Sequence, residues 1–143
     1  MEGEIALMVM SHGLFAKAAM DSLELVIGKQ KNYDTMAIQL IDNVEALKDE
    51  LFAKVARLNT ENGLVVFTDI IGGTPMNLAG RLLDRENVLL CSGFNLPVLL
   101  EFSLNRGRGF SEIREVIKRA YGNGMSLITR DEMKEEEEDD LFL

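Results

Sequence analysis

The chain contains a single histidine, His12, and its position suggests chemistry. It lies in the polar turn Ser11-His12-Gly13, directly after an apolar segment at residues 5–10 that predicts a buried strand. A second apolar segment, residues 65–67, leads to Asp69. The carboxyl ends of parallel strands meet at one edge of a sheet, so His12 and Asp69 are expected to be neighbours although nearly sixty positions separate them.

An imidazole beside a carboxylate suits a carrier of phosphoryl groups. A neutral imidazole is a good nucleophile near pH 7, because its ordinary pKa lies near about 6.5. Its attack on a phosphoryl group gives a labile N–P bond that can pass the group onward. We expect Asp69 to accept a hydrogen bond from the other ring nitrogen of His12, which fixes the tautomer and stabilises the positive ring. This chemistry requires no metal and no organic cofactor.

The segment after Asp69 predicts a turn that binds an anion. Gly72 and Gly73 permit backbone angles that are closed to other residues, Thr74 is a good N-cap, and Pro75 suits the first helical position. The free N–H groups of such a turn, with the Thr74 hydroxyl, would face phosphoryl oxygens. Gly72, Gly73 and Thr74 are therefore the predicted phosphate-binding residues.

Strands and helices are expected to alternate along the chain. Strands are predicted at residues 5–10, 33–41, 65–67 and 88–91, with a last strand at 125–129; helices are predicted at 14–27, 44–58, 74–83, 98–104 and 111–121. Gly28 is expected to end the first helix. The capping box of Asp42 with Glu45 and the N-cap Ser111 are expected to begin two later helices. Ser11 is expected either to cap the first helix or to contact phosphate. This order predicts an α/β fold, a small open three-layer sandwich around a mostly parallel sheet of order 2-1-3-4, with a C-terminal antiparallel strand.

Composition limits the function further. The 143 residues suffice for one domain, expected at residues 1–130, and most of the net charge of −9 belongs to an acidic tail at 131–143 that we expect to be solvated and mobile. The nearly balanced body argues against nucleic-acid binding, and Arg106 and Arg108 are expected in a flexible, solvated loop. One cysteine and one histidine make no convincing zinc site or internal disulfide. No apolar run approaches the roughly 18 residues of a membrane span and no signal peptide is indicated, so the expected location is the cytoplasm.

Three motifs carry a family resemblance. They are Ser11-His12-Gly13, the turn Asp69-x-x-Gly72-Gly73-Thr74-Pro75 with Asn77 following, and Gly93-x-Asn95-x-Pro97. In this order and at this spacing, over about residues 4 to 130, the chain resembles the IIA component (EIIA) of the mannose-type bacterial sugar phosphotransferase system.

The resemblance implies partners and an assembly. It implies that His12 accepts a phosphoryl group from phospho-HPr on Nε2, which leaves Nδ1 to Asp69, and passes the group to a IIB protein that serves the membrane IIC/IID complex. It also implies a homodimer in which the last strand, near residues 125–129, crosses to the other subunit. Some relatives continue through a linker into IIB; here an acidic tail follows, so a separate IIB protein is expected. A IIA protein need not touch the sugar, whose identity the membrane partner determines.

Other functions stay open at this stage. Related domains donate phosphoryl groups to dihydroxyacetone kinase, and a neighbouring kinase gene would favour that role. A non-catalytic regulatory or ligand-binding module would bind a small molecule tightly and never carry phosphate. A Cys-His-Asp hydrolase built from Cys91, His12 and Asp69 is disfavoured because Cys91 lacks a nucleophile elbow. Flavin or dinucleotide binding is disfavoured because no Gly-x-Gly-x-x-Gly follows the first strand.

Overall fold

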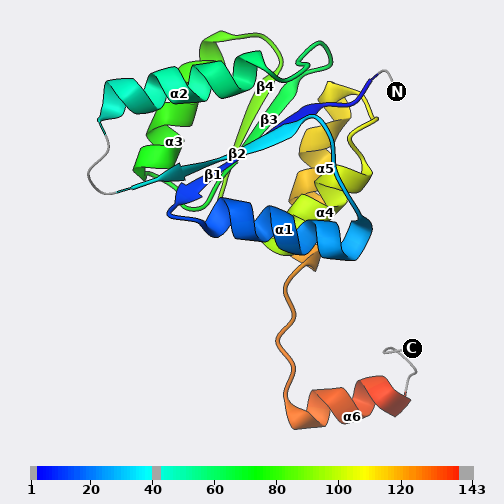
Figure 1. Cartoon of the computed structure of the whole chain (residues 1–143). Helices are drawn as coiled ribbons and strands as arrows, with labels where there is room; N and C mark the ends of the chain where they lie inside the picture. The colour runs from blue at the N-terminus through cyan, green and yellow to red at the C-terminus, as the bar shows by residue number, and fades with distance from the viewer. Residues whose placement is uncertain (1–2, 40–42, 139–143) are drawn as a thin grey trace.

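Four parallel strands form the centre of the molecule. They are β1 (Ala6–His12), β2 (Tyr33–Ile38), β3 (Leu64–Thr68) and β4 (Val88–Ser92), in the order β2-β1-β3-β4. The computed structural model describes residues 3–39 and 43–138. The predicted parallel order is confirmed, and it places β1 and β3 side by side in the middle of the sheet (Figure 1).

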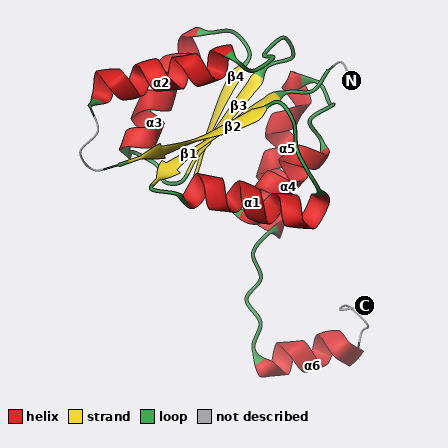
Figure 2. Cartoon of the chain, in the orientation of Figure 1, coloured by secondary structure: helices red, strands yellow, loops and turns green. Residues whose placement is uncertain are grey.

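Helices cover both faces of this sheet, which confirms the three predicted layers (Figure 2). One face packs against α1 (Phe15–Ile27), α4 (Leu96–Leu104) and α5 (Phe110–Asn123). The other packs against α2 (Val44–Ala56), α3 (Thr74–Ala79) and the 3₁₀ helix η1 (Gly80–Asp84). Alternate residues of β1 and β3 enter the two cores, so both central strands are apolar and buried up to the polar residues at their carboxyl ends.

Two predicted helix N-caps lie further toward the N-terminus, by one residue at α3 and by two residues at α5. The helix predicted to have Thr74 as its N-cap has Gly73 there instead, and Thr74 is the first helical residue. The last domain helix begins at Phe110 after Gly109 rather than after Ser111. In both places a glycine in extended conformation precedes the helix, and glycine is also an accepted N-cap residue.

The start of α2 differs from the predicted capping box. The side chain of Asn43 accepts hydrogen bonds from the backbone N–H groups of Glu45 and Ala46, so Asn43 is the N-cap. Asp42, which the prediction used, lies outside the described residues. Gly28, by contrast, ends α1 as expected, with φ at +91°.

Arg106 overturns the prediction of a solvated basic loop. Its side chain is only 2% exposed. Nε donates to the carbonyl of Ile5 at 2.9 Å, and Nη1 and Nη2 donate to the carbonyls of Lys31 and Asn32 at 2.6 Å each. Burial lowers the pKa of Arg106, but an arginine remains a cation near neutral pH. The side chain therefore joins the segments before β1 and β2 to the loop after α4, at the end of the sheet away from His12.

Replacing Arg106 should destabilise the fold. An Arg106→Met variant removes one buried and two partly buried hydrogen bonds, and we expect the free energy of unfolding to fall by about 3 kcal/mol. Denaturant titration at matched protein concentration measures it. Arg108→Met is the control, because Arg108 lies exposed in the same loop and should change stability by less than about 0.5 kcal/mol. Equal stability of the two variants would contradict the role given to Arg106.

The C-terminal region differs most from expectation. Residues 125–129 form no strand in the single chain; they are an extended connection to a helix, α6 (Arg130–Glu138), which lies apart from the body (Figure 1). A strand within one chain is therefore wrong, because this segment pairs with none of the four strands in the described part of the chain. The exchange of this segment between two copies stays a prediction. Among the described residues, no helix combines the length and the apolar character needed to cross a membrane.

Candidate functional site

The structure brings His12 and Asp69 into direct contact. His12 is the last residue of β1, and Asp69 follows the last residue of the adjacent strand β3. The ring Nδ1 of His12 lies 2.8 Å from Asp69 Oδ2, and the backbone N–H of His12 donates to the same oxygen at 2.9 Å. The backbone N–H of Ile70 donates to Oδ1 at 3.0 Å. The carboxylate is thus fixed from both sides, and the predicted pair is present.

Burial and hydrogen bonding assign different roles to the two ring nitrogens. The side chain of His12 is 50% exposed, whereas that of Asp69 is 10% exposed. An ionised carboxylate can only accept hydrogen bonds, so the proton of a neutral His12 ring lies on Nδ1. The lone pair of Nε2 is then free to react at the exposed edge of the ring.

The environment of Asp69 keeps it ionised. Burial, the largest single effect, raises its pKa, but the hydrogen bonds from the backbone and ring of His12 and from the backbone of Ile70, with the charge of His12, together outweigh it. The net result is a pKa below the ordinary value. Asp69 is therefore a stable acceptor for the Nδ1 proton and a stable counter-charge to a positive ring.

The glycine turn lies against the reactive edge of the ring. A Cβ placed on Gly73 would lie 2.9 Å from Cε1 and 3.4 Å from Nε2 of His12, so only glycine leaves the ring in place. Gly72 has φ at +82°, a backbone conformation that residues with a side chain rarely adopt. The backbone of the predicted phosphate-binding turn thus borders the nitrogen that would react.

A cavity opens beside His12 at the carboxyl end of the sheet. Its volume is about 480 Å³, and it is lined by His12, Gly13, Ile38, Gln39, Val44, Leu47 and Thr74. Thr74, predicted to contact phosphate, lines the same cavity as the imidazole. A cavity of similar volume, about 440 Å³, lies between α4 and α5 and contains neither His12 nor Asp69, so volume alone does not mark the site.

Ser11 has a structural role. It is fully buried; its Oγ accepts a hydrogen bond from the backbone N–H of Ala16 at 2.7 Å and donates to the carbonyl of Gly13 at 3.2 Å. Of the two roles considered for Ser11, the structure supports the stabilisation of the turn into α1. Ser11 thereby fixes the backbone on which His12 is presented.

Cys91 is not equipped as a nucleophile. Burial raises the pKa of its thiol to about 11, so it is protonated near neutral pH. It lies on β4 opposite Phe67 of β3 and packs against the apolar core, and its raised pKa argues against the Cys-His-Asp hydrolase.

The sequence interpretation did not identify an apolar surface beside the site. Leu14, two residues after His12, is 70% exposed, and Ile70 and Ile71, directly after Asp69, are 55% and 78% exposed. Phe15 is also largely exposed and stacks on Phe94 with ring centroids 5.1 Å apart. Large apolar residues beside the His12 and Asp69 motifs could have indicated this surface, because most of their side-chain area is not packed into either hydrophobic core.

Comparison with known proteins identifies the family. The model of the EIIA-man family, described as the PTS system fructose IIA component, matches residues 6–121. The chain belongs to this family. It is 31% identical over 103 residues to the mannose-specific EIIAB component of the phosphotransferase system of Escherichia coli K12, a match that covers 71% of this chain and 32% of that protein. The chain therefore spans about a third of the length of that relative.

One further curated relative and one solved structure are also similar to this chain. The chain is 26% identical over 98 residues to the fructose-specific EIIA component of Bacillus subtilis 168, covering 68% of this chain and 67% of that protein. The crystal structure of an EIIA component from Streptococcus agalactiae has a TM-score of 0.77 at 23% identity, covers 86% of this chain and 96% of that one, and shows the shared fold. The EIIA resemblance inferred from the three motifs is thus confirmed.

A methyl group at Gly73 of this EIIA domain should displace the His12 ring. In Gly73→Ala we expect changed ring ¹H and ¹⁵N resonances of His12 and a weaker Nδ1–H···Asp69 bond, because the added Cβ would lie 2.9 Å from Cε1. Gly80→Ala is the matched control, since Gly80 has helical φ of −57° and nothing lies within 4 Å of its added Cβ. NMR of the histidine ring measures both variants, and an unchanged His12 spectrum in Gly73→Ala would refute the close packing.

The stability that Asp69 provides should depend on pH in a defined direction. Its folded-state pKa is lowered, so its contribution is complete above the unfolded-state value of about 3.9 and is lost as the pH falls through the folded-state value. The difference in unfolding free energy between the wild type and Asp69→Asn should thus shrink on acidification from pH 7 to pH 3. Urea titrations measure it, with Asp49→Asn, exposed on α2, as control. A difference that grows with acid would contradict the assigned direction.

Proposed function

We propose that this chain is a phosphocarrier of a sugar phosphotransferase system, which accepts a phosphoryl group from phospho-HPr on His12 and passes it to a IIB protein or domain. The observation that carries the proposal is the half-exposed imidazole whose Nδ1 is held by a buried carboxylate. A regulatory module without chemistry would not require such a pair. The sugar named in a relative's description belongs to that relative; this domain need only recognise proteins.

The geometry supports a balanced transfer step at Nε2. The Nε2 lone pair of His12 attacks the phosphorus, and the bond from phosphorus to the donor's nitrogen breaks, with its electron pair returning to the donor. The His12 ring becomes positive and keeps its Nδ1 proton, which Asp69 holds at 2.8 Å. Attack by the acceptor on phosphorus then breaks the Nε2–P bond and restores the neutral ring.

The glycine turn supplies the donors for the phosphoryl oxygens in this proposal. Gly73 borders Nε2, and Thr74 lines the cavity that begins at the ring. In this proposal the Thr74 hydroxyl donates to a phosphoryl oxygen from the wall of that cavity. Backbone N–H groups of Gly73 and Thr74, fixed before the reaction, stabilise charge without reorganisation during transfer. The N–H of Gly72, which donates to Sδ of Met76 at 3.0 Å, exchanges that partner for a phosphoryl oxygen.

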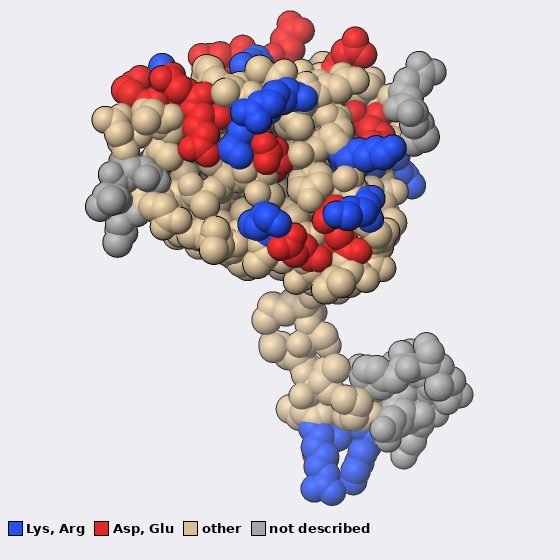
Figure 3. All heavy atoms as spheres, viewed as in Figure 1, with Lys and Arg blue, Asp and Glu red and all other residues tan. Residues whose placement is uncertain are grey.

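The surface beside His12 suits protein partners. The exposed side chains of Leu14, Phe15, Ile70 and Ile71 form an apolar surface next to the reactive ring, as expected where two proteins exchange a phosphoryl group in contact. On the face seen in Figure 3, the acidic and basic side chains of the described residues are interspersed rather than gathered into a basic patch. This pattern favours protein partners over nucleic acid.

The proposal includes an assembly and a location. The domain spans residues 1–130, acts in the cytoplasm and forms a homodimer through residues 125–129, followed by the acidic tail. The extended conformation of that segment supports pairing with a second copy, since all five residues are exposed, with Met125 and Leu127 at 70% and 78%.

Phosphorylation by phosphoenolpyruvate, enzyme I and HPr tests the function. The wild type should become labelled and His12→Ala should not, because the chain has one histidine. Asp69→Asn should slow the transfer by up to about 10⁴-fold, the effect of the same change beside the reacting histidine of a Ser-His-Asp triad. Circular dichroism checks that both variants fold. Label that persists in His12→Ala, or a wild type that is never labelled, would overturn the proposal.

A further inference from the structure

A methionine sulfur contacts the glycine turn beside the reactive ring. The backbone N–H of Gly72 donates to Sδ of Met76 at 3.0 Å. Met76 lies in α3, four residues further along the chain. A thioether is a weak acceptor, so this contact holds the turn through a bond that an anionic oxygen can readily replace.

The position of the Gly72–Gly73 turn affects the His12 ring because the two are in close contact. Gly72 precedes Gly73, whose backbone lies so close to His12 that an added Cβ would be 2.9 Å from Cε1. A small displacement of the Gly72 backbone is therefore transmitted to the edge of the ring that carries Nε2. The sulfur of Met76 thus influences the position of Nε2 of His12 through the Gly72–Gly73 backbone, without contacting the ring.

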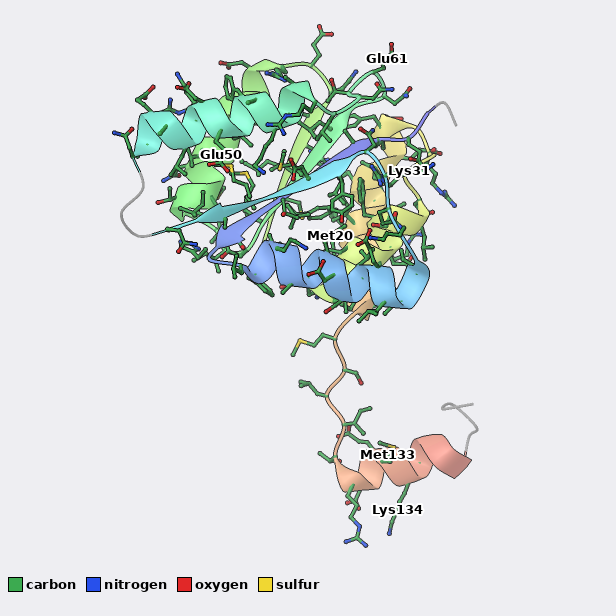
Figure 4. The ribbon with its side chains drawn as sticks, in the orientation of Figure 1. Met20, Lys31, Glu50, Glu61, Met133 and Lys134 are labelled. Atoms are coloured by element: carbon green, nitrogen blue, oxygen red, sulfur yellow. The ribbon has the colours of Figure 1, made fainter. Side chains whose placement is uncertain are left out.

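Met76 is also accessible to an oxidant when the core methionines are not. Met8, Met10, Met20 and Met36 are at most 2% exposed, and Figure 4 shows Met20 on α1 facing the sheet. Met76 is half-buried. The other two accessible methionines that the structure describes, Met125 and Met133, are 70% and 39% exposed and lie in the C-terminal region, with Met133 on α6 apart from the site (Figure 4).

We propose that Met76 is a positioning residue for phosphoryl transfer, and that oxidation of its sulfur by peroxide moves the Gly72–Gly73 turn and slows the reaction at His12. The inference rests on the proposed function. In the oxidation step the sulfur attacks one peroxide oxygen, the O–O bond breaks, the S–O bond forms, and water leaves after proton transfer. The sulfoxide oxygen is a stronger acceptor than the thioether and extends one bond beyond the sulfur, so it holds the Gly72 N–H in a different place.

The test compares hydrogen peroxide treatment of three proteins. Peptide mass spectrometry quantifies the oxidation of Met76. In the treated wild type, kcat with phospho-HPr should fall about 100-fold, because a small displacement of reacting groups has an effect of this size. KM should change little. Methionine sulfoxide reductases should restore the rate. Met76→Leu should start about fivefold slower, the worth of a weak hydrogen bond, and should lose no further activity. The matched control Met133→Leu, on α6 and outside the proposed dimer segment, should keep wild-type activity and wild-type sensitivity.

A second readout separates this inference from the function itself. The amide resonance of Gly72 and the ring resonances of His12 should shift when Met76 is oxidised, whether or not the protein ever carries phosphate. Unchanged resonances with Met76 fully oxidised, or equal peroxide sensitivity in Met76→Leu and wild type, would overturn the role of Met76. Untreated wild type that is never labelled, with the resonance shifts present, would instead overturn the proposed function alone.

Discussion

One hydrogen bond between two neighbouring strands organises this molecule, from Nδ1 of His12 to Oδ2 of Asp69. It can form because β1 and β3 are parallel and adjacent, so their carboxyl ends meet. The carboxylate also accepts the backbone N–H groups of His12 and Ile70, which keeps it ionised despite its burial. Since the bond occupies Nδ1, it leaves Nε2 as the only ring nitrogen available for chemistry.

The rest of the fold serves this presentation from both ends of the sheet. At the carboxyl end, Ser11 fixes the turn after β1, and Gly73 lets the second turn approach the ring. At the opposite end, Arg106 joins three backbone segments through its buried guanidinium. The apolar cores on both faces hold the strands between these two polar clusters. A rigid scaffold thus carries an exposed imidazole, as contact between two proteins requires.

The sequence was sufficient for the fold and for the residues of the pair. Apolar strands that alternate with amphipathic helices predict a parallel sheet covered by helices. In the predicted strand order the first and third strands are adjacent, which places His12 beside Asp69. The sequence could not predict which of several neighbouring residues becomes the N-cap of a helix. The N-caps are Asn43, Gly73 and Gly109, although adjacent residues were equally suitable. The burial of Arg106 depends on three carbonyls distant in sequence, and the conformation of residues 125–129 depends on which backbone is present to pair with them.

The central claim is that the phosphoryl group is carried on Nε2 while Nδ1 keeps its proton for Asp69. NMR of the protein labelled with ¹⁵N-histidine and phosphorylated through HPr tests it most directly, because the ³¹P–¹⁵N coupling identifies the bonded nitrogen. The site geometry predicts coupling to Nε2 of His12 together with a protonated Nδ1. Coupling to Nδ1 would show that the Asp69 hydrogen bond is broken in the phosphorylated state and that Nε2 is not the reacting nitrogen.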